Sequence, residues 1–267
     1  MSNLIRISLA TRVRSTALAT IAAATTVAAG HAHAADRNAL REIVQDECLV
    51  HWLQRQDPAP CERVYLTDAR ARDGYAVLAD RKGGAHFLLI PVKTISGIES
   101  PEVLEPQALN YFAAAWQARD RLGAVLGHGV HRGDVGLAVN PQHGRGQDQL
   151  HIHIECLGGE VHGVLHAAAE RVSDHWSTIN LAGRQYQALR VVGEELGAIN
   201  PFGLLAHRLP GAAQEMGSYT LMVAGMQFKD GPGFIVLAGK DVPGAELFLD
   251  STCALAEGDG RGVDARE

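Results

Sequence analysis

Two histidines, His151 and His153, stand two positions apart in residues 147–157, which read QDQLHIHIECL. Side chains alternate between the two faces of a β-strand, so a strand here places both imidazoles on one face together with Glu155. Three interpretations fit such a pair. It is a metal site, a histidine nucleophile with an assisting histidine, or a set of ordinary polar residues on a solvated sheet face.

The chemistry of imidazole favours the nucleophile. A neutral imidazole, with an ordinary pKa of about 6.5, attacks phosphorus at neutral pH when an acceptor holds its other nitrogen. Donors must also surround the phosphate to absorb developing charge. The preceding turn supplies glycine N–H groups together with Arg145 and Gln147, and Asn140 ends the predicted strand before that turn.

Cys156 falls on the opposite strand face, with Leu150, Ile152 and Ile154, so a Cys–His site within this strand is disfavoured. A metal bound by His151, His153 and Glu155 remains an alternative, although catalytic zinc usually requires three ligands at suitable angles. We expect no metal and no cofactor.

The surrounding sequence predicts an α+β fold built on an antiparallel sheet. A short helix and a loop are expected over residues 35–62, a hairpin over 74–92, a strand at 134–140, and a strand–turn–strand at 219–239. A second helix is expected over 160–179. The clearest element is a long amphipathic helix over 107–127, whose apolar stripe comprises Leu109, Phe112, Ala115, Ala118, Leu122 and Val125.

The first 34 residues have the pattern of an export signal. Three arginines precede an Ala-rich apolar core, and an Ala-His-Ala cleavage pattern follows it. We expect residues 1–34 to be a cleaved signal peptide or a retained membrane anchor, and residues 35–267 to form one domain in the periplasm or on the periplasmic face of the inner membrane. Loss of three arginines and no acid takes the net charge from −6 to −9, which argues against nucleic-acid binding.

The four cysteines of this exported chain suggest two disulfides, for which three pairings exist. A Cys48–Cys61 bridge would close a short, turn-rich loop. Cys156–Cys253 would then tie the C-terminal region to the histidine strand. We favour this pairing over free thiols or a metal site.

Together, these motifs resemble a known group of proteins. The succession GLAVN, PQHGRG and DQLHIHIECL, with the upstream HFLLIP that contains His86, is similar to the histidine-triad (HIT-like) superfamily. The ordered motifs DECL, PAPC, GYAVL, AWQARD and PFGLLA more closely resemble bacterial CDP-diacylglycerol pyrophosphatases, across nearly the whole chain after the leader.

The resemblance implies a HIT-like fold and metal-independent hydrolysis of CDP-diacylglycerol to CMP and phosphatidate. It makes His151 the nucleophile, through a cytidylyl-histidine intermediate, and His153 a donor or stabiliser. Asn140, Gln147 and His86 would belong to the substrate site, and Arg145 is a further candidate for the phosphate. A membrane surface is the expected partner, and related small folds often form homodimers.

One position departs from the histidine triad. Its first histidine would fall at residue 149, where this chain has Gln149. A glutamine forms hydrogen bonds but does not titrate, so we expect activity to survive and count Gln149 as a secondary substrate-site residue. Two alternatives remain: a HIT-like hydrolase or transferase acting on soluble nucleotide conjugates, and a periplasmic histidine-based metal-binding protein.

Overall fold

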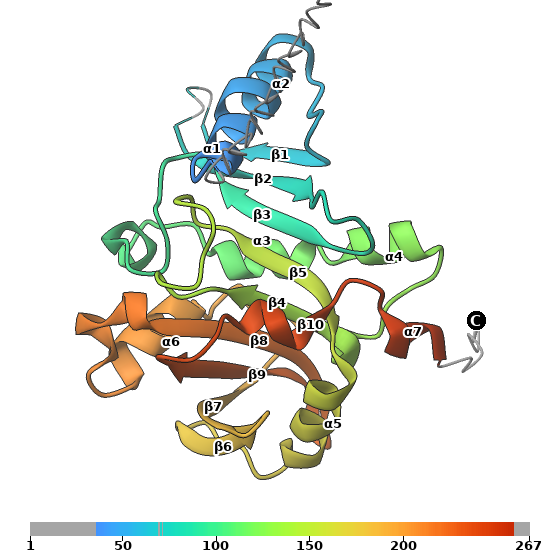
Figure 1. The fold of residues 1–267 in the computed structure, drawn as a ribbon, viewed down its shortest axis with the longest axis vertical. Coiled ribbons are helices and arrows are strands. Elements are labelled where there is room, and N and C mark those ends of the chain that lie inside the picture. The colour runs from blue at the N-terminus through green and yellow to red at the C-terminus, as the bar shows by residue number, and fades with distance from the viewer. Residues whose placement is uncertain (1–35, 69, 71, 259–267) are drawn as a thin grey trace, which may run out of the picture. The chain divides into compact units, whose positions relative to one another are not determined.

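The computed structural model describes residues 36–68, 70 and 72–258. They form a ten-stranded sheet in the order β1-β2-β3-β5-β4-β8-β9-β7-β6, with β10 paired to β5, and every adjacent pair is antiparallel (Figure 1). The α+β prediction is therefore confirmed. The strands are β1 (Arg63–Leu66), β2 (Gly74–Ala79), β3 (Phe87–Pro91), β4 (Val135–Val139), β5 (Ile152–Leu157), β6 (Ser177–Leu181), β7 (Arg184–Val192), β8 (Tyr219–Phe228), β9 (Gly231–Lys240) and β10 (Leu249–Asp250).

Both predicted hairpins are present. The strands β2 and β3 pair across the Gly-Gly turn, and β8 and β9 pair along ten residues each. The expected helix near the start is also present as α1 (Ala39–Glu42), a π-helical stretch (Ile43–Cys48) and α2 (Leu49–Arg55), followed by a loop. No helix among the described residues has the length and apolar character needed to cross a bilayer.

The predicted long helix over 107–127 is wrong. Two short helices, α3 (Tyr111–Gln117) and α4 (Asp120–Leu126), take its place, and Asn110 caps the first by accepting from the N–H of Ala113. Between them Arg119 donates to the carbonyl of Trp116, which a continuous helix would bond to the N–H of residue 120. Backbone bonds spanning three residues tighten the chain at this point.

The apolar stripe survives this break only in part. Its four central members, Phe112, Ala115, Ala118 and Leu122, are fully buried, as predicted. Val125 is 54 % exposed, so its assignment to the stripe was wrong. The break between α3 and α4 explains why one period does not hold through the whole segment.

The predicted helix over 160–179 was also too long. The helix α5 (Gly159–Ala168) ends early, and β6 follows. The β6–β7 hairpin turns at Ala182 and Gly183, which have φ angles of 48° and 72°. Two consecutive left-handed residues are typical of a type I′ turn, whose usual Asn-Gly or Asp-Gly signal is missing here.

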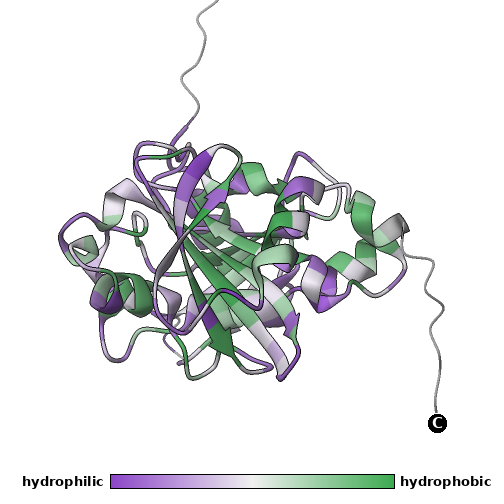
Figure 2. Cartoon of the chain, turned by 90° about the horizontal axis from the view of Figure 1, so that it is seen from below, coloured by the Kyte–Doolittle hydropathy of each residue, from purple (hydrophilic) through white to green (hydrophobic). Residues whose placement is uncertain are grey.

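The two sheet faces are covered differently. One face carries the largest core, in which α3 and α6 (Pro201–Arg208) pack on the central strands. The other face has two separate apolar clusters, one beneath the N-terminal helices on β2 and β3 and one beneath α5 on β4 to β9. Figure 2 shows the predominantly hydrophobic strands between more polar outer segments. The histidines of β5 lie between these two clusters.

Candidate active site

The strand β5 separates its side chains as the sequence predicted. Leu150, Ile152, Ile154 and Cys156 belong to the large core on one face. His153 and Glu155 face the other side, beside Leu88 of the neighbouring β3. His151, just before the strand, is 8 % exposed and His153 is 4 % exposed, so the site is nearly covered.

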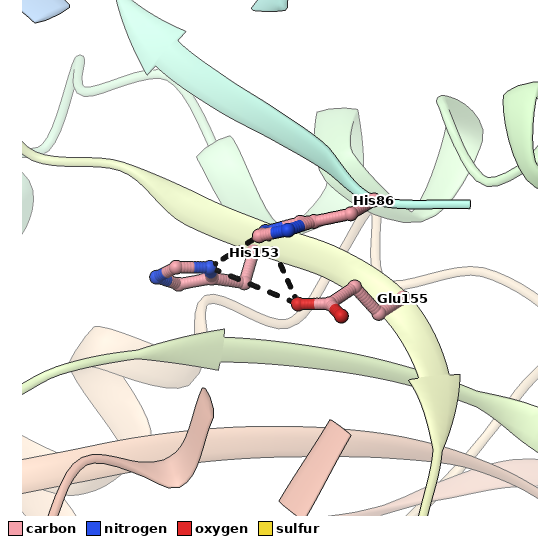
Figure 3. Close-up of side chains that lie close together, drawn as sticks. All are labelled: His86, His153 and Glu155. Carbon is pink, nitrogen blue, oxygen red and sulfur yellow. Dashed lines mark hydrogen bonds and ion pairs between the residues drawn. The ribbon is translucent and has the colours of Figure 1, made fainter. Parts of the chain in front are cut away.

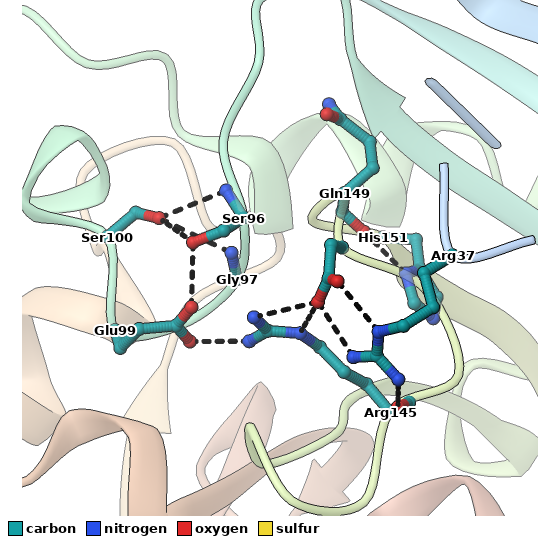
Figure 4. Close-up of polar contacts among 9 residues, drawn as sticks. Arg37, Ser96, Gly97, Glu99, Ser100, Arg145, Gln149 and His151 are labelled. Atoms are coloured by element: carbon teal, nitrogen blue, oxygen red, sulfur yellow. Dashed lines mark hydrogen bonds and ion pairs between the residues drawn. The ribbon is translucent and has the colours of Figure 1, made fainter. Parts of the chain in front are cut away.

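The ring of His151 is held through one nitrogen. Its Nδ1 lies 2.7 Å from the backbone oxygen of Gln149 (Figure 4). A carbonyl only accepts, so we assign the proton to Nδ1, which leaves the lone pair on Nε2. Burial, reinforced by the nearby His153, lowers the pKa of His151 to about 4. The imidazole is therefore neutral near pH 7, as a nucleophile requires.

A buried cluster surrounds His153 (Figure 3). His86 directly precedes β3. Its Nε2 lies 3.0 Å from Nδ1 of His153 and 3.1 Å from Oε1 of Glu155. Burial, followed by the charge of His153, lowers the pKa of His86 to about 4. The structure thus brings His86 to the site, as the sequence predicted.

The opposite side of His153 faces Glu246, which sequence reasoning missed. Glu246 lies on η6, a 3-10 helix (Ala245–Phe248), and its Oε2 is 3.0 Å from Nε2 of His153. The close approach of His153, and to a smaller extent of Asn140, lowers the pKa of Glu246. The 3.0 Å contact lacks hydrogen-bond geometry, but the carboxylate still favours a proton on Nε2 of His153, so that Nδ1 can accept from His86.

Asn140 is buried directly after β4, as expected of a site residue. Its Oδ1 makes no hydrogen bond within the described part of the chain. The backbone of Gly244 packs so closely on this amide that a Cβ at residue 244 would lie 2.1 Å from Oδ1. Glycine therefore lets the segment that carries Glu246 approach Asn140.

Gln149 occupies the position at which this chain departs from the histidine triad, and hydrogen bonds to the backbone hold its side chain in place. Its Nε2 donates to the carbonyls of Pro91 and Lys93 at 2.9 and 3.0 Å. The side chain joins the start of the histidine strand to the end of β3, while its backbone oxygen orients His151. Its position favours an orienting role over direct contact with the phosphorus.

Arg145 and Gln147 have structural partners (Figure 4). The Arg145 guanidinium is 2.6 Å from Glu99 and 3.4 Å from Asp148. Gln147 donates to the carbonyl of Asp36 and accepts from the N–H of Leu40, so it holds the N-terminal helices against the turn. The structure does not bring these two side chains into contact with the histidines, and their phosphate-binding role stays a prediction.

Comparison with known proteins gives this geometry a context. A family model described as CDP-diacylglycerol pyrophosphatase matches residues 35–257. The CDP-diacylglycerol pyrophosphatase of Yersinia pestis is 40 % identical over 224 residues, which cover 81 % of this chain and 84 % of that protein.

The chain belongs to the CDP-diacylglycerol pyrophosphatase family.

The family resemblance predicted from the motifs is thus confirmed. Both predicted disulfides are present too. Cys48–Cys61 joins the end of the π-helical stretch to the loop before β1, and Cys156–Cys253 joins β5 to the residues after β10. The second bridge explains how residues near 246 reach a site built mainly on β5. The predicted Cys156–Cys253 pairing was therefore a feature of the sequence that could have placed Glu246 near the site.

The predicted metal-ligand set requires a correction. Within the described residues, the three groups that could share an ion are His86, His153 and Glu155, whose donor atoms lie within 4.8 Å of one another. His151, which the sequence had placed in this set, instead bonds to the backbone of Gln149. In this pyrophosphatase-family chain, the histidine predicted as nucleophile is therefore separate from the potential metal ligands.

Glu155 gives this cluster a pH-dependent stability. Burial, followed by the nearby charges of Asp80 and Glu246, raises its pKa to about 8. Between its ordinary pKa of about 4.3 and that value, the folded state keeps a proton that the unfolded state has lost, so stability falls as pH rises. The free energy of unfolding of Glu155→Gln, relative to that of the wild type, should rise between pH 5 and 8 by at most about 1.4 kcal/mol per pH unit.

Urea unfolding at a series of pH values measures this difference. Glu42→Gln, which removes the same charge from the exposed surface of α1, is the matched control and should show little pH-dependent difference. A constant offset between Glu155→Gln and the wild type over this range would contradict the raised pKa.

Proposed function

We propose that His151 is the nucleophile with which this member of the family hydrolyses CDP-diacylglycerol. Family membership establishes the reaction, which releases CMP and phosphatidate. The observation that carries the assignment is the 2.7 Å contact between Nδ1 of His151 and the Gln149 oxygen. It favours the tautomer in which Nε2 has a lone pair to donate.

The reaction then has two displacements. Nε2 of His151 attacks the CMP phosphorus, an N–P bond forms, and the bond from that phosphorus to the bridging oxygen breaks as phosphatidate leaves. Nδ1 keeps its proton, and the Gln149 carbonyl stabilises the positive charge on the substituted ring. Water then attacks the same phosphorus and gives up a proton to solvent, the N–P bond breaks with its electrons returning to Nε2, and CMP leaves.

Neighbouring groups support this chemistry. His153 is positioned to donate from Nε2 to the phosphate or the leaving oxygen once the substrate displaces Glu246. The unsatisfied Oδ1 of Asn140 would accept from a hydroxyl or N–H of the ligand once the segment carrying Gly244 moves off it. His86 and Glu155 hold His153 from behind, which makes them positioning residues in this scheme.

Two alternatives are weaker. A HIT-like enzyme acting on soluble nucleotide conjugates would use the same histidine, but the family that the chain matches is described by a lipid nucleotide. A metal-binding protein would use His86, His153 and Glu155, so its function would be lost with a chelator. Assays with chelator present separate this second alternative from the histidine mechanism.

We further propose a HIT-like fold, export through the N-terminal leader, and action at a membrane surface, with a homodimer as the expected assembly. The succession of Asn140, a glycine-containing turn and the histidine strand supports the first point. Two disulfides support an oxidising compartment outside the cytoplasm. The leader itself lies outside the described residues.

The pH dependence of kcat/KM tests the nucleophile. Because the free-enzyme pKa of His151 is lowered to about 4, activity should persist as pH falls through 6.5 and be lost near pH 4. CMP release would be measured with chelator present, and circular dichroism at each pH would confirm that the protein stays folded. An acid limb near 6.5 in a folded enzyme would argue against a buried, neutral His151 as the attacking group.

A further inference from the structure

A largely apolar cavity of about 360 Å³ lies on the same sheet face as the histidines, between the end of β5 and β7, which is four strands further along the sheet. Its walls come from the start of α5, the β6–β7 hairpin and a bridging segment, residues 243–248. The side chains of Val161, Tyr186, Leu247 and Phe248 make its lining largely apolar. The volume is within the range of about 300–1,000 Å³ typical of ligand sites.

The sheet register connects this cavity to the site. His153 of β5 pairs with Ala138 of β4, which pairs with Met222 of β8. Met222 in turn pairs with Leu237 of β9, and Leu237 pairs with Ala188 of β7. Tyr186 lies two residues from Ala188 and so faces the same side. Four steps of about 4.8 Å between neighbouring strands put the Tyr186 wall roughly 20 Å from the histidine strand, whereas Gly158 in the opposite wall directly follows β5.

The bridging segment spans this interval (Figure 1). The N–H of Ala245 donates to Oγ1 of Thr220 on β8 at 2.8 Å, about midway. On one side of this anchor Glu246 reaches His153, and on the other the ring of Phe248 packs on Tyr186 with centroids 5.4 Å apart. One short segment therefore borders both the histidines and the cavity.

We propose that this cavity receives an acyl chain of CDP-diacylglycerol, with residues 243–248 forming the boundary between the diphosphate and lipid ends of the substrate. The inference rests on the proposed function, because the phosphatidate leaving group must extend away from His151. Burial of hydrocarbon against apolar walls supplies the driving force. Leu247, at 69 % exposed, is a large apolar side chain at the cavity that the protein itself leaves uncovered.

Another cavity of the described structure is larger but does not suit a hydrocarbon chain. It has a volume of about 690 Å³, and its lining includes Glu99, Glu215, Lys240 and Asp241. Charged walls impose a desolvation cost on an acyl chain, and this cost is lower in the smaller cavity, where Glu160 and Arg184 are the charged residues of a mainly apolar lining. The polarity of the two cavities thus favours the smaller one for the lipid end.

The test compares two substrates with the same diphosphate. CDP-glycerol lacks acyl chains, and CDP-dihexanoylglycerol carries short ones and is used below its micelle-forming concentration, so that no lipid surface is present. Leu247→Glu places a charge at the cavity, and Val161→Phe reduces its volume. Each should lower kcat/KM for the acylated substrate by about 10-fold while that for CDP-glycerol changes less than about twofold.

Val125→Glu is the matched control, because it places the same charge on an exposed apolar residue of α4, away from the cavity. It should leave both substrates unaffected. Equal losses on both substrates in the cavity variants, no loss, or a loss seen only with lipid vesicles would each overturn the inference. His151→Ala distinguishes the two proposals, because it abolishes hydrolysis of both substrates if the proposed function is right.

Discussion

Replacing His151 with alanine is expected to lower turnover of CDP-diacylglycerol by about 10³-fold or more, because the covalent route disappears with its nucleophile. CMP release by residues 35–267, measured with chelator present, gives the rate. Rapid denaturation during turnover of substrate labelled at the CMP phosphorus should also trap labelled wild-type protein. The label should be stable in base and lost in acid, as expected for an N–P bond.

His175→Ala is the matched control for this variant. Its imidazole is 81 % exposed and pairs with the adjacent Asp174, so its loss should leave turnover within about twofold and labelling intact. Near-normal activity of a folded His151→Ala protein would rule out the nucleophilic role. Strong labelling of that variant would assign the covalent intermediate to a different residue.

Removing the Cys156–Cys253 bridge, by replacing both cysteines with alanine, is expected to have the largest effect on stability. The bridge joins residues 97 apart in sequence, and its loss frees a long loop in the unfolded state. The free energy of unfolding should fall by about 2–5 kcal/mol, measured by urea denaturation. Turnover should fall as well, because the bridge holds the C-terminal residues that follow Glu246.

The other bridge supplies the comparison. Cys48 and Cys61 are 13 residues apart, so the corresponding double alanine variant should lose about 1–2 kcal/mol less than the first. It should also leave turnover less affected, because its loop does not contain Glu246. Unchanged unfolding of the Cys156/Cys253 variant would show that the bridge contributes nothing to the native state.

Local patterns predicted the parts of the fold in which neighbouring residues decide the structure. Alternation along residues 149–156 separated the histidines from Cys156, and the Gly-Gly turn identified the first hairpin. Periodicity failed where a side chain competes with the backbone. The bond from Arg119 to the Trp116 carbonyl ends α3 although the apolar period continues to Leu122.

The site was predictable where it is continuous in sequence. Asn140, His151 and His153 come from one strand–turn–strand unit, and His86 comes from the adjacent strand. Glu246 comes from about 90 residues further along the chain, through long-range pairing that no local pattern encodes. The ion pair of Arg145 with Glu99 likewise depends on a distant loop, which the type and spacing of Arg145 do not reveal.

The side chain of Thr220 links the two segments that carry Asn140 and Glu246. Its buried hydroxyl donates to the Val139 carbonyl and accepts from the Ala245 N–H, both at 2.8 Å. Each partner is the immediate sequence neighbour of a site residue, Asn140 in one case and Glu246 in the other. Valine would match threonine in shape but would release both partners, so this position tolerates less variation than its distance from the reacting phosphorus suggests.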